Sequence, residues 1–125
     1  MVRGFAEGFA QRSNLRLKIE FDSIEEVLSP AVELILFRVC QEAFMNVRRH
    51  ANASSVTLRY HASGADAVLE VDDNGVGMDS ADETHLGVGI ESMRTRLQEI
   101  GGSLELENTG RGTLVRARAP RNIVN

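Results

Sequence analysis

Two pairs of strand-like segments, each pair joined by a short polar connection, constrain the fold of this chain more than any other feature. The paired segments are residues 56–61 and 67–72, connected by residues 63–66, and residues 103–107 and 113–119, connected by residues 108–112. In the first pair apolar and polar residues alternate, which is the period of a half-buried strand. The short connections, with Gly64 in one and Gly110 in the other, favour β-hairpins. Antiparallel pairing is therefore expected.

The rest of the chain predicts helices and one further strand. The expected elements are helices over residues 3–12, 30–50 and 90–100, and a strand over residues 15–21. Ser29 is expected to cap the long helix and Pro30 to lie in its first turn, whereas Gly101 ends the last helix. Because hairpins outnumber βαβ units in this order, we expect an α+β two-layer sandwich. It would contain a mixed, mostly antiparallel sheet of about five strands with about three helices on one face.

Composition and charge limit the classes of function. The 125 residues suffice for one domain. The net charge is −4 at pH 7 and the basic residues are scattered, which argues against a nucleic-acid surface but not against a bound nucleotide. The longest apolar run, within residues 34–40, is too short to span a bilayer, so a membrane-anchored parent protein would carry its anchor elsewhere. The single cysteine, Cys40, fits a reducing, cytoplasmic compartment.

Three polar residues border the apolar stripe of the long predicted helix. Glu42, Asn46 and Arg49 are spaced i, i+4 and i+7, which places them within an arc of about 60°. Polar groups at the edge of a core need partners, and a metal ion with phosphates would supply them. An amide oxygen is a good Mg²⁺ ligand, and a carboxylate can orient a water or accept a proton. Taken alone, the three residues favour an ordinary solvated helix surface.

An acidic residue followed by glycines ends the second strand of the first hairpin. Strand alternation places Asp73 on the same side as Leu69 and Val71, so a carboxylate would point into the core. Such a group needs a donor, and the exocyclic amine of a purine would serve. Gly75 and Gly77 leave space for a flat ring near the backbone. A plain Asn-Gly turn is the alternative, weakened because no strand-like alternation follows directly.

Two further glycine motifs lie at the edges of predicted elements. Gly87-Val88-Gly89 directly precedes a helix, where backbone N–H groups can face an anion. Gly110-Arg111-Gly112-Thr113 opens the last strand. Each motif is also common in ordinary turns and loops, so neither identifies a site alone.

In order and spacing, the four motifs resemble the nucleotide-binding boxes of the ATPases and kinases that include gyrase B, Hsp90, MutL and the histidine kinases. The matching segments are residues 42–46 for the N box, 73–77 for the G1 box, 87–90 for the G2 box and 110–113 for the G3 box. The resemblance covers nearly the whole chain and implies the Bergerat ATP-binding fold. Residues 37–51 and 89–96 are more narrowly similar to the histidine kinases of the NarL/DesK type, and residues 78–86 would fit their short ATP lid.

The resemblance implies a role for each matching residue, with ATP and Mg²⁺ as cofactors. The residues implied in cofactor binding are Asn46, Arg49, His50, Asp73, Gly75, Gly77, Gly87, Val88, Gly89 and Thr113. Asp73 would accept a hydrogen bond from the adenine amine, with Thr113 assisting through water. Asn46 would coordinate Mg²⁺ and Arg49 would contact phosphate. Glu42 and Asn46 would be the catalytic residues, with Glu42 positioning a water or assisting removal of a proton.

The implied activity is that of the catalytic domain of a two-component sensor histidine kinase. Such a domain transfers the γ-phosphate of ATP to a histidine on a separate helical-hairpin dimerisation domain of the same kinase, and a response regulator acts downstream. His50, His61 and His85 lack the His-Asp or His-Glu context of a phospho-acceptor. Residues 1–125 would form a single domain, in which residues 1–12 either belong to the domain or form a connector helix.

Three alternatives remain open at this point. A serine-phosphorylating anti-sigma factor shares the boxes, but the Arg-His-Ala end of the N box argues against it. An ATP hydrolase of the gyrase or MutL type uses added segments that a chain of this length lacks. A non-enzymatic binding module is disfavoured by the intact boxes. No direct contact with nucleic acid is expected, and contact with a membrane only through segments outside this chain.

Overall fold

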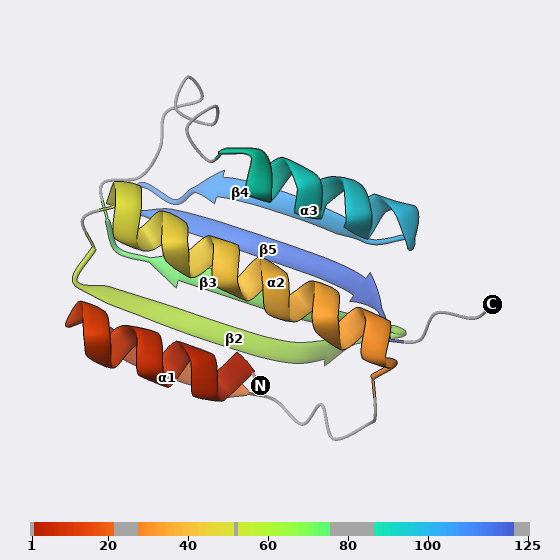
Figure 1. Ribbon diagram of the computed structural model, residues 1–125, viewed down its shortest axis with the longest axis horizontal. Coiled ribbons are helices and arrows are strands. Elements are labelled where there is room, and N and C mark those ends of the chain that lie inside the picture. Colours follow the sequence, from red (N-terminus) through yellow and green to blue (C-terminus); the bar gives the residue numbers. More distant parts are fainter. Residues whose placement is uncertain (1, 22–27, 52, 76–86, 122–125) are drawn as a thin grey trace.

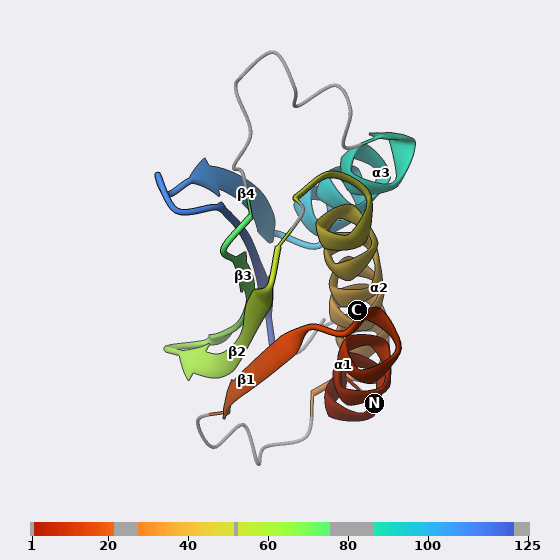
Figure 2. The same ribbon diagram turned by 90° about the vertical axis from the view of Figure 1, so that its left-hand side faces the viewer.

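The computed structural model describes residues 2–21, 28–51, 53–75 and 87–121, and these form two layers, a sheet and a set of helices (Figures 1 and 2). The elements are α1 (Val2–Ser13), β1 (Arg16–Phe21), α2 (Pro30–Asn46), a π-helical turn (Val47–Ala51), β2 (Ser55–Ser63), β3 (Asp66–Asp73), α3 (Gly87–Glu99), β4 (Ser103–Asn108) and β5 (Thr113–Pro120). The three α-helices cover one face of the sheet (Figure 2). The predicted two-layer α+β sandwich is confirmed.

The five strands lie in the order β1-β2-β3-β5-β4. β1 pairs with β2 in parallel, and the other three pairings are antiparallel. The hairpins β2–β3 and β4–β5 are the two that the sequence predicts. Gly64 turns the first of them with a φ of 63°, a left-handed conformation that glycine adopts without the steric penalty of a side chain. The sheet is therefore mixed and mostly antiparallel, as expected.

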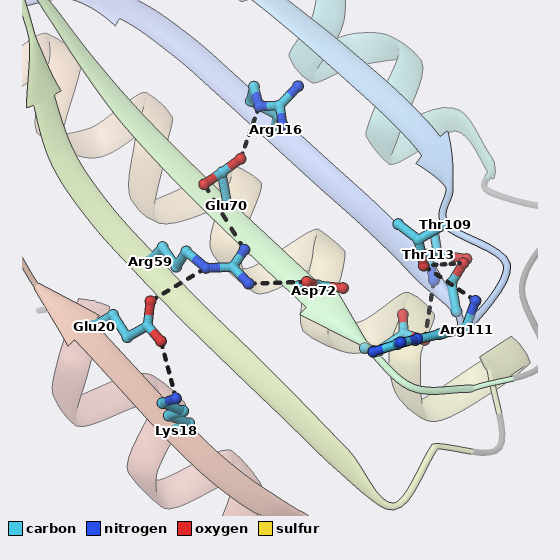
Figure 3. A network of polar contacts seen from close by, with 11 residues as sticks. Lys18, Glu20, Arg59, Glu70, Asp72, Thr109, Arg111, Thr113 and Arg116 are labelled. Atoms are coloured by element: carbon cyan, nitrogen blue, oxygen red, sulfur yellow. Dashed lines mark hydrogen bonds and ion pairs between the residues drawn. The ribbon is translucent and has the colours of Figure 1, made fainter.

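Strand alternation sets where the core lies. On β3, Ala67, Leu69 and Val71 are almost completely buried on the face that the helices cover. From α2, Leu36 and Phe44 are fully buried against the same core. The other face of the sheet carries a network of ion pairs instead (Figure 3). The core thus fills the space between the two layers, and any residue on the helix-facing side of a strand end points into it.

An aromatic cluster attaches α1 to the long helix. Phe5 lies 5.8 Å from both Phe37 and Phe44, measured between ring centroids, and Phe9 lies 5.4 Å from Phe44. These are edge-to-face arrangements, which aromatic rings prefer over face-to-face stacking. Ala6 and Phe9 are also buried in the common core. α1 therefore packs as an integral part of the helical layer.

The long helix begins where the sequence predicts, but its last turn differs from a regular α-helix. Ser29 is the N-cap and Pro30 follows it, as predicted, although the Ser29 hydroxyl makes no capping hydrogen bond. Its backbone N–H is held instead by the carbonyl of Arg121. At the other end the α-helix stops at Asn46 and continues as a π-helical turn. The Val47 N–H is shared between the carbonyls of Ala43 and Phe44, and the π-helical turn begins at this residue.

Two smaller sequence predictions concern single residues and segments. Cys40 is fully buried, and burial raises the pKa of its thiol to about 12, as expected for an inert core cysteine. The predicted lid over residues 78–86, which includes His85, lies outside the described residues. Within the described ranges, none of the helices is both long and apolar enough to cross a lipid bilayer.

Candidate active site

The sequence motifs meet at one end of the sandwich. The C-terminal ends of α2 and β3 lie at the same end as the N-terminal ends of α3 and β5 (Figure 1). This arrangement follows from the topology, because β3 and β5 are antiparallel neighbours and α3 packs beside α2. Residues separated by up to about 70 positions in the sequence therefore have access to one region between the two layers.

Asp73 is a buried carboxylate at the last position of β3. Its side chain lies on the core face, as predicted, and the residue is only 6% exposed. Burial raises the pKa of the Asp73 carboxyl, and hydrogen bonds from the backbone of Gly75 and Thr113 oppose that shift. These N–H groups donate to Oδ1 at 2.8 and 3.4 Å. Among the described residues no hydrogen bond reaches Oδ2, so this oxygen can accept one from a ligand.

Two residues at the start of β5 complete the surroundings of Asp73. A Cβ atom at Gly112 would lie 1.8 Å from the Asp73 carbonyl oxygen, so only glycine fits at this position. Thr113 is 7% exposed, and its hydroxyl is buried without a hydrogen-bond partner among the described residues. A buried hydroxyl is normally satisfied by protein or ordered water. The buried Thr113 hydroxyl therefore fits a group that forms its hydrogen bond with a ligand or with a bound water.

Asn46 carries the most unusual polar group of the site. The residue is 7% exposed, and within the described part of the chain neither its amide oxygen nor its amide nitrogen has a hydrogen-bond partner. Leaving a primary amide buried and unpaired costs roughly 1–3 kcal/mol. A hard cation would use the amide oxygen as a ligand, and a nucleotide phosphate could accept from the nitrogen. The donor set at Asn46 therefore fits a Mg²⁺–nucleotide complex.

Glu42 lies one helical turn before Asn46 and faces α3. A Cβ atom added at Gly89 would lie 2.3 Å from Oε2 and 2.5 Å from Cδ of Glu42. The carboxylate therefore occupies the space beside Gly89 that a side chain would need. This contact joins the N box on α2 to the first turn of α3.

For the remaining predicted site residues, the structure describes the position of some and only the backbone, or nothing, of others. Arg49 is exposed in the π-helical turn and makes no ion pair with the described residues. The α3 helix begins at Gly87, three residues before its predicted start, so Gly87 and Val88 lie in its first turn instead of preceding it. The side chains of Val88 and His50, and the whole of Gly77, lie outside the described residues. The structure thus brings Glu42 to Gly89, and Asp73 to Gly75 and Thr113.

Sequence reasoning missed one residue that shapes this site. The Asn74 side-chain oxygen accepts hydrogen bonds from the backbone N–H groups of Ser54 and Ser55, both at 2.9 Å. Its amide nitrogen donates to the Ser54 hydroxyl at 2.9 Å. These bonds hold the chain directly after Asp73 against the start of β2. An Asn after a strand is a known turn signal, but its long-range partners cannot be read from the sequence.

Comparisons with known proteins agree with this geometry. Residues 31–123 match the family described as histidine kinase-, DNA gyrase B- and HSP90-like ATPases. The chain is 32% identical to the sensor histidine kinase MctS of Rhizobium johnstonii, over 91% of this chain and 25% of that protein. It is 35% identical to the sensor histidine kinase LiaS of Bacillus subtilis, over 94% of this chain and 34% of that protein. The chain thus spans about a quarter to a third of the length of these relatives.

Solved structures share the fold at lower sequence identity. The Acinetobacter baumannii histidine kinase AdeS matches with a TM-score of 0.73 and 14% identity, over 99% of this chain and 62% of that one. The histidine kinase domain of the blue-light activated kinase of Erythrobacter litoralis EL346 matches with a TM-score of 0.71 and 18% identity. The match covers 95% of this chain and 58% of that one. These structures confirm the fold expected from the four motifs, and the match of residues 31–123 to the family model confirms the family.

Proposed function

Because the chain belongs to the family of histidine kinase-, DNA gyrase B- and HSP90-like ATPases, we propose that it is the ATP- and Mg²⁺-binding catalytic domain of a two-component sensor histidine kinase. In this proposal residues 1–125 form one cytoplasmic domain that includes α1. The domain transfers the γ-phosphate of ATP to a histidine on a helical-hairpin domain of the same kinase, and a response regulator acts downstream. Any membrane anchor belongs to other segments of the parent protein.

One observation carries the proposal. Asn46, whose buried amide has no hydrogen-bond partner among the described residues, is the last residue of α2, and Asp73, whose carboxylate is buried, is the last residue of β3; these two elements end at the same end of the sandwich (Figure 1). Burying either group is costly unless something pairs with it. ATP with Mg²⁺ supplies both partners, since the adenine amine is a donor and the metal requires oxygen ligands. Both groups thus gain a partner from the same ligand.

The residues divide into a base-binding and a phosphate-binding set. In the first, Asp73 accepts from the adenine amine, Thr113 helps through a water, and Gly75 with Gly77 leaves room for the ring and sugar. The phosphate-binding set consists of Asn46, Arg49, His50, Gly87, Val88 and Gly89. Asn46 would hold Mg²⁺, which when bound offsets negative charge on the phosphates. The exposed Arg49 and the first turn of α3 would contact the phosphates directly.

Glu42 is the residue that acts on the acceptor. An imidazole nitrogen of the acceptor histidine attacks the γ-phosphorus, the bond to the bridging oxygen breaks, and ADP leaves. Glu42 accepts the proton that the imidazole loses, or orients the ring for attack. Most of the rate enhancement comes from positioning and charge neutralisation, because the transferred group needs little covalent help.

The relatives favour a histidine as acceptor. MctS, LiaS and a further relative, UhpB of Salmonella typhimurium, which is 37% identical over 80% of this chain, are named as histidine kinases. They give no support to the serine-phosphorylating or ATP-hydrolysing alternative. LiaS and UhpB are of the NarL/DesK type, the subfamily that the N box of this chain resembles.

A calorimetric titration of ATP with and without Mg²⁺ tests the cofactor set. We expect Mg²⁺ to tighten ATP binding at least about tenfold, or about 1.4 kcal/mol. Asn46→Asp should change this dependence, because it replaces a neutral ligand with a charged one. Gln41→Ala is the matched control on the same helix, since Gln41 lines a separate cavity of about 490 Å³ between α1 and α2. A titration that is identical with and without Mg²⁺ would contradict the role of Asn46.

A transfer assay tests the acceptor. The chain is mixed with a separately produced helical-hairpin domain of a relative such as LiaS, together with ATP labelled on the γ-phosphate. We expect acid-labile, base-stable label on the helical domain and none on this chain. Label on this chain alone would overturn the assignment of the acceptor to another domain.

A further inference from the structure

The Glu42 carboxylate occupies the space beside Gly89 that the side chain of any other residue would fill. A Cβ atom at position 89 would lie 2.3 Å from Oε2, 2.5 Å from Cδ and 2.9 Å from Oε1 of Glu42. All three distances are shorter than a normal contact between a Cβ and another heavy atom. The nearest neighbour of this glycine is therefore one specific carboxylate.

The backbone conformation does not explain why this residue is a glycine. Gly89 lies inside α3 and has no positive φ, unlike Gly64 or Gly110. A glycine inside a helix costs roughly 1 kcal/mol relative to alanine. Position 89 therefore carries a residue of low helix propensity, and the Glu42 carboxylate occupies the space that a side chain there would need.

We propose that Gly89 is a positioning residue for Glu42. By lacking a side chain, it allows the Glu42 carboxylate to rest against the first turn of α3, which fixes the direction in which Glu42 faces the acceptor. This inference rests on the proposed histidine kinase activity, in which Glu42 accepts the proton of the acceptor imidazole. It gives the second glycine of the G2 box a role beyond offering its backbone N–H to a phosphate.

Alanine at position 89 would move Glu42 and leave the fold in place. The atoms that it meets are the far end of a flexible side chain, which can rotate away. The contrast is with Gly102, where an added Cβ would lie 2.2 Å from the backbone oxygen of Arg118, an atom held in the sheet. Alanine at 89 also keeps its own N–H. If that N–H were the whole contribution of Gly89, the alanine variant would transfer phosphate normally.

Four variants test this: Gly89→Ala, Glu42→Ala, the double variant, and Gly4→Ala as a matched control. Gly4 is also a helical glycine, but an added Cβ there meets nothing within 4 Å. The measurements are the ATP dissociation constant, and kcat and KM for phosphate transfer to the supplied helical domain. We expect Gly89→Ala to lower kcat about 10- to 100-fold, with ATP affinity within about twofold of the parent chain. Gly4→Ala should match the parent chain in both.

The double variant shows whether Gly89 acts through Glu42 or affects phosphate transfer independently of it. If Gly89 acts through Glu42, the double variant transfers phosphate no more slowly than Glu42→Ala alone. Losses that multiply in the double variant would overturn the proposal, as would a normal kcat for Gly89→Ala. Thermal unfolding checks the fold, and Gly89→Ala should melt no lower than the parent chain because alanine favours the helix.

A spectroscopic measurement keeps this inference separate from the proposed function. The ¹³C resonance of the Glu42 carboxyl group should shift in Gly89→Ala and stay unchanged in Gly4→Ala. An unchanged resonance in Gly89→Ala would refute the contact, whatever the activity of the chain. If the resonance shifts but neither the parent chain nor any variant transfers phosphate, the positioning of Glu42 by Gly89 stands and the kinase assignment fails.

Discussion

At the scale of single residues, the site depends on polar groups whose burial costs free energy in the absence of a ligand. Asp73 is the clearest case, because two backbone N–H groups satisfy Oδ1 while the described residues leave Oδ2 without a hydrogen bond. The inward direction of Asp73 follows from strand alternation and could be predicted from the sequence. The unpaired amide of Asn46 could not, because its burial depends on how closely the end of α2 approaches the sheet.

Replacing Asp73 by Asn should weaken ATP binding. The substitution keeps the shape and one acceptor oxygen, but it can direct an NH₂ group at the adenine amine, so that two donors face each other. We expect at least a tenfold loss of affinity, about 1.4 kcal/mol, by calorimetry. Asp72→Asn is the control, since Asp72 lies on the opposite face of β3 and pairs with Arg59 at 3.0 Å. Equal affinity for the parent chain and Asp73→Asn would exclude this role for the carboxylate.

The same carboxylate should give a pH dependence to stability. Burial raises the pKa of Asp73 in the folded state above its ordinary value of 3.8, so the folded chain binds this proton more tightly than the unfolded chain. The stability associated with protonated Asp73 is therefore fully present below pH 3.8, and it is lost as the pH rises to the folded pKa. Urea unfolding at a series of pH values should show the parent chain losing stability relative to Asp73→Asn across that window. A constant difference between the two chains would contradict the raised pKa.

At the scale of elements, the pattern of the sequence predicts the five strands and three helices, because periods of two and 3.6 are local properties. The parallel pairing of β1 with β2 depends on contacts between distant segments, and no hairpin fixes it. The π-helical turn after Asn46 was also missed, since a change in hydrogen-bond register has no clear residue signature. Likewise, the contact of Glu42 with Gly89 depends on how two helices pack, which neither motif reveals alone.

Gly112 lies where the start of β5 approaches the end of β3, and a side chain there should disrupt this junction. Gly112→Ala would place a methyl group 1.8 Å from the Asp73 carbonyl oxygen, a backbone atom that cannot move without separating the strands. We expect a loss of at least about 2 kcal/mol in the free energy of unfolding, together with weaker ATP binding. Gly110→Ala is the control, because an added Cβ there meets nothing within 4 Å and adds only the strain of a φ of 79°. That strain costs about 1–2 kcal/mol. A smaller loss for Gly112→Ala than for Gly110→Ala would contradict the steric argument.

At the scale of the whole molecule, the two faces of the sheet carry different kinds of contact. The helix-facing side is apolar and ends in the proposed nucleotide site, whereas the open side carries an ion-pair network that runs from strand to strand (Figure 3). Arg59 on β2 pairs with Glu20 on β1 and with Asp72 on β3, and Arg116 on β5 pairs with Glu70 on β3. The network spans the sheet without using any residue of the site. Stability on one face and binding on the other should therefore be separable.

Glu70→Gln tests this separation. Glu70 is 8% exposed, and its carboxylate lies 2.8 Å from Arg116 Nε and 3.8 Å from Arg59 Nη1. Removing its charge leaves two partly buried guanidinium groups with one fewer counter-charge, so we expect a loss of about 1–3 kcal/mol in the free energy of unfolding. Glu105→Gln is the matched control, because its side chain is 62% exposed and its 3.6 Å pair with Arg116 is screened by water.

Both variants should bind ATP with the affinity of the parent chain, because the charge that each removes is on the open face of the sheet. Urea unfolding and calorimetry on the same preparations measure the two quantities together. If Glu70→Gln weakened ATP binding by the same free energy as it lowered stability, the two faces would be coupled through β3. The central strand, whose last residue is Asp73, would then transmit strain from the network to the site, and the separation of the faces would be refuted.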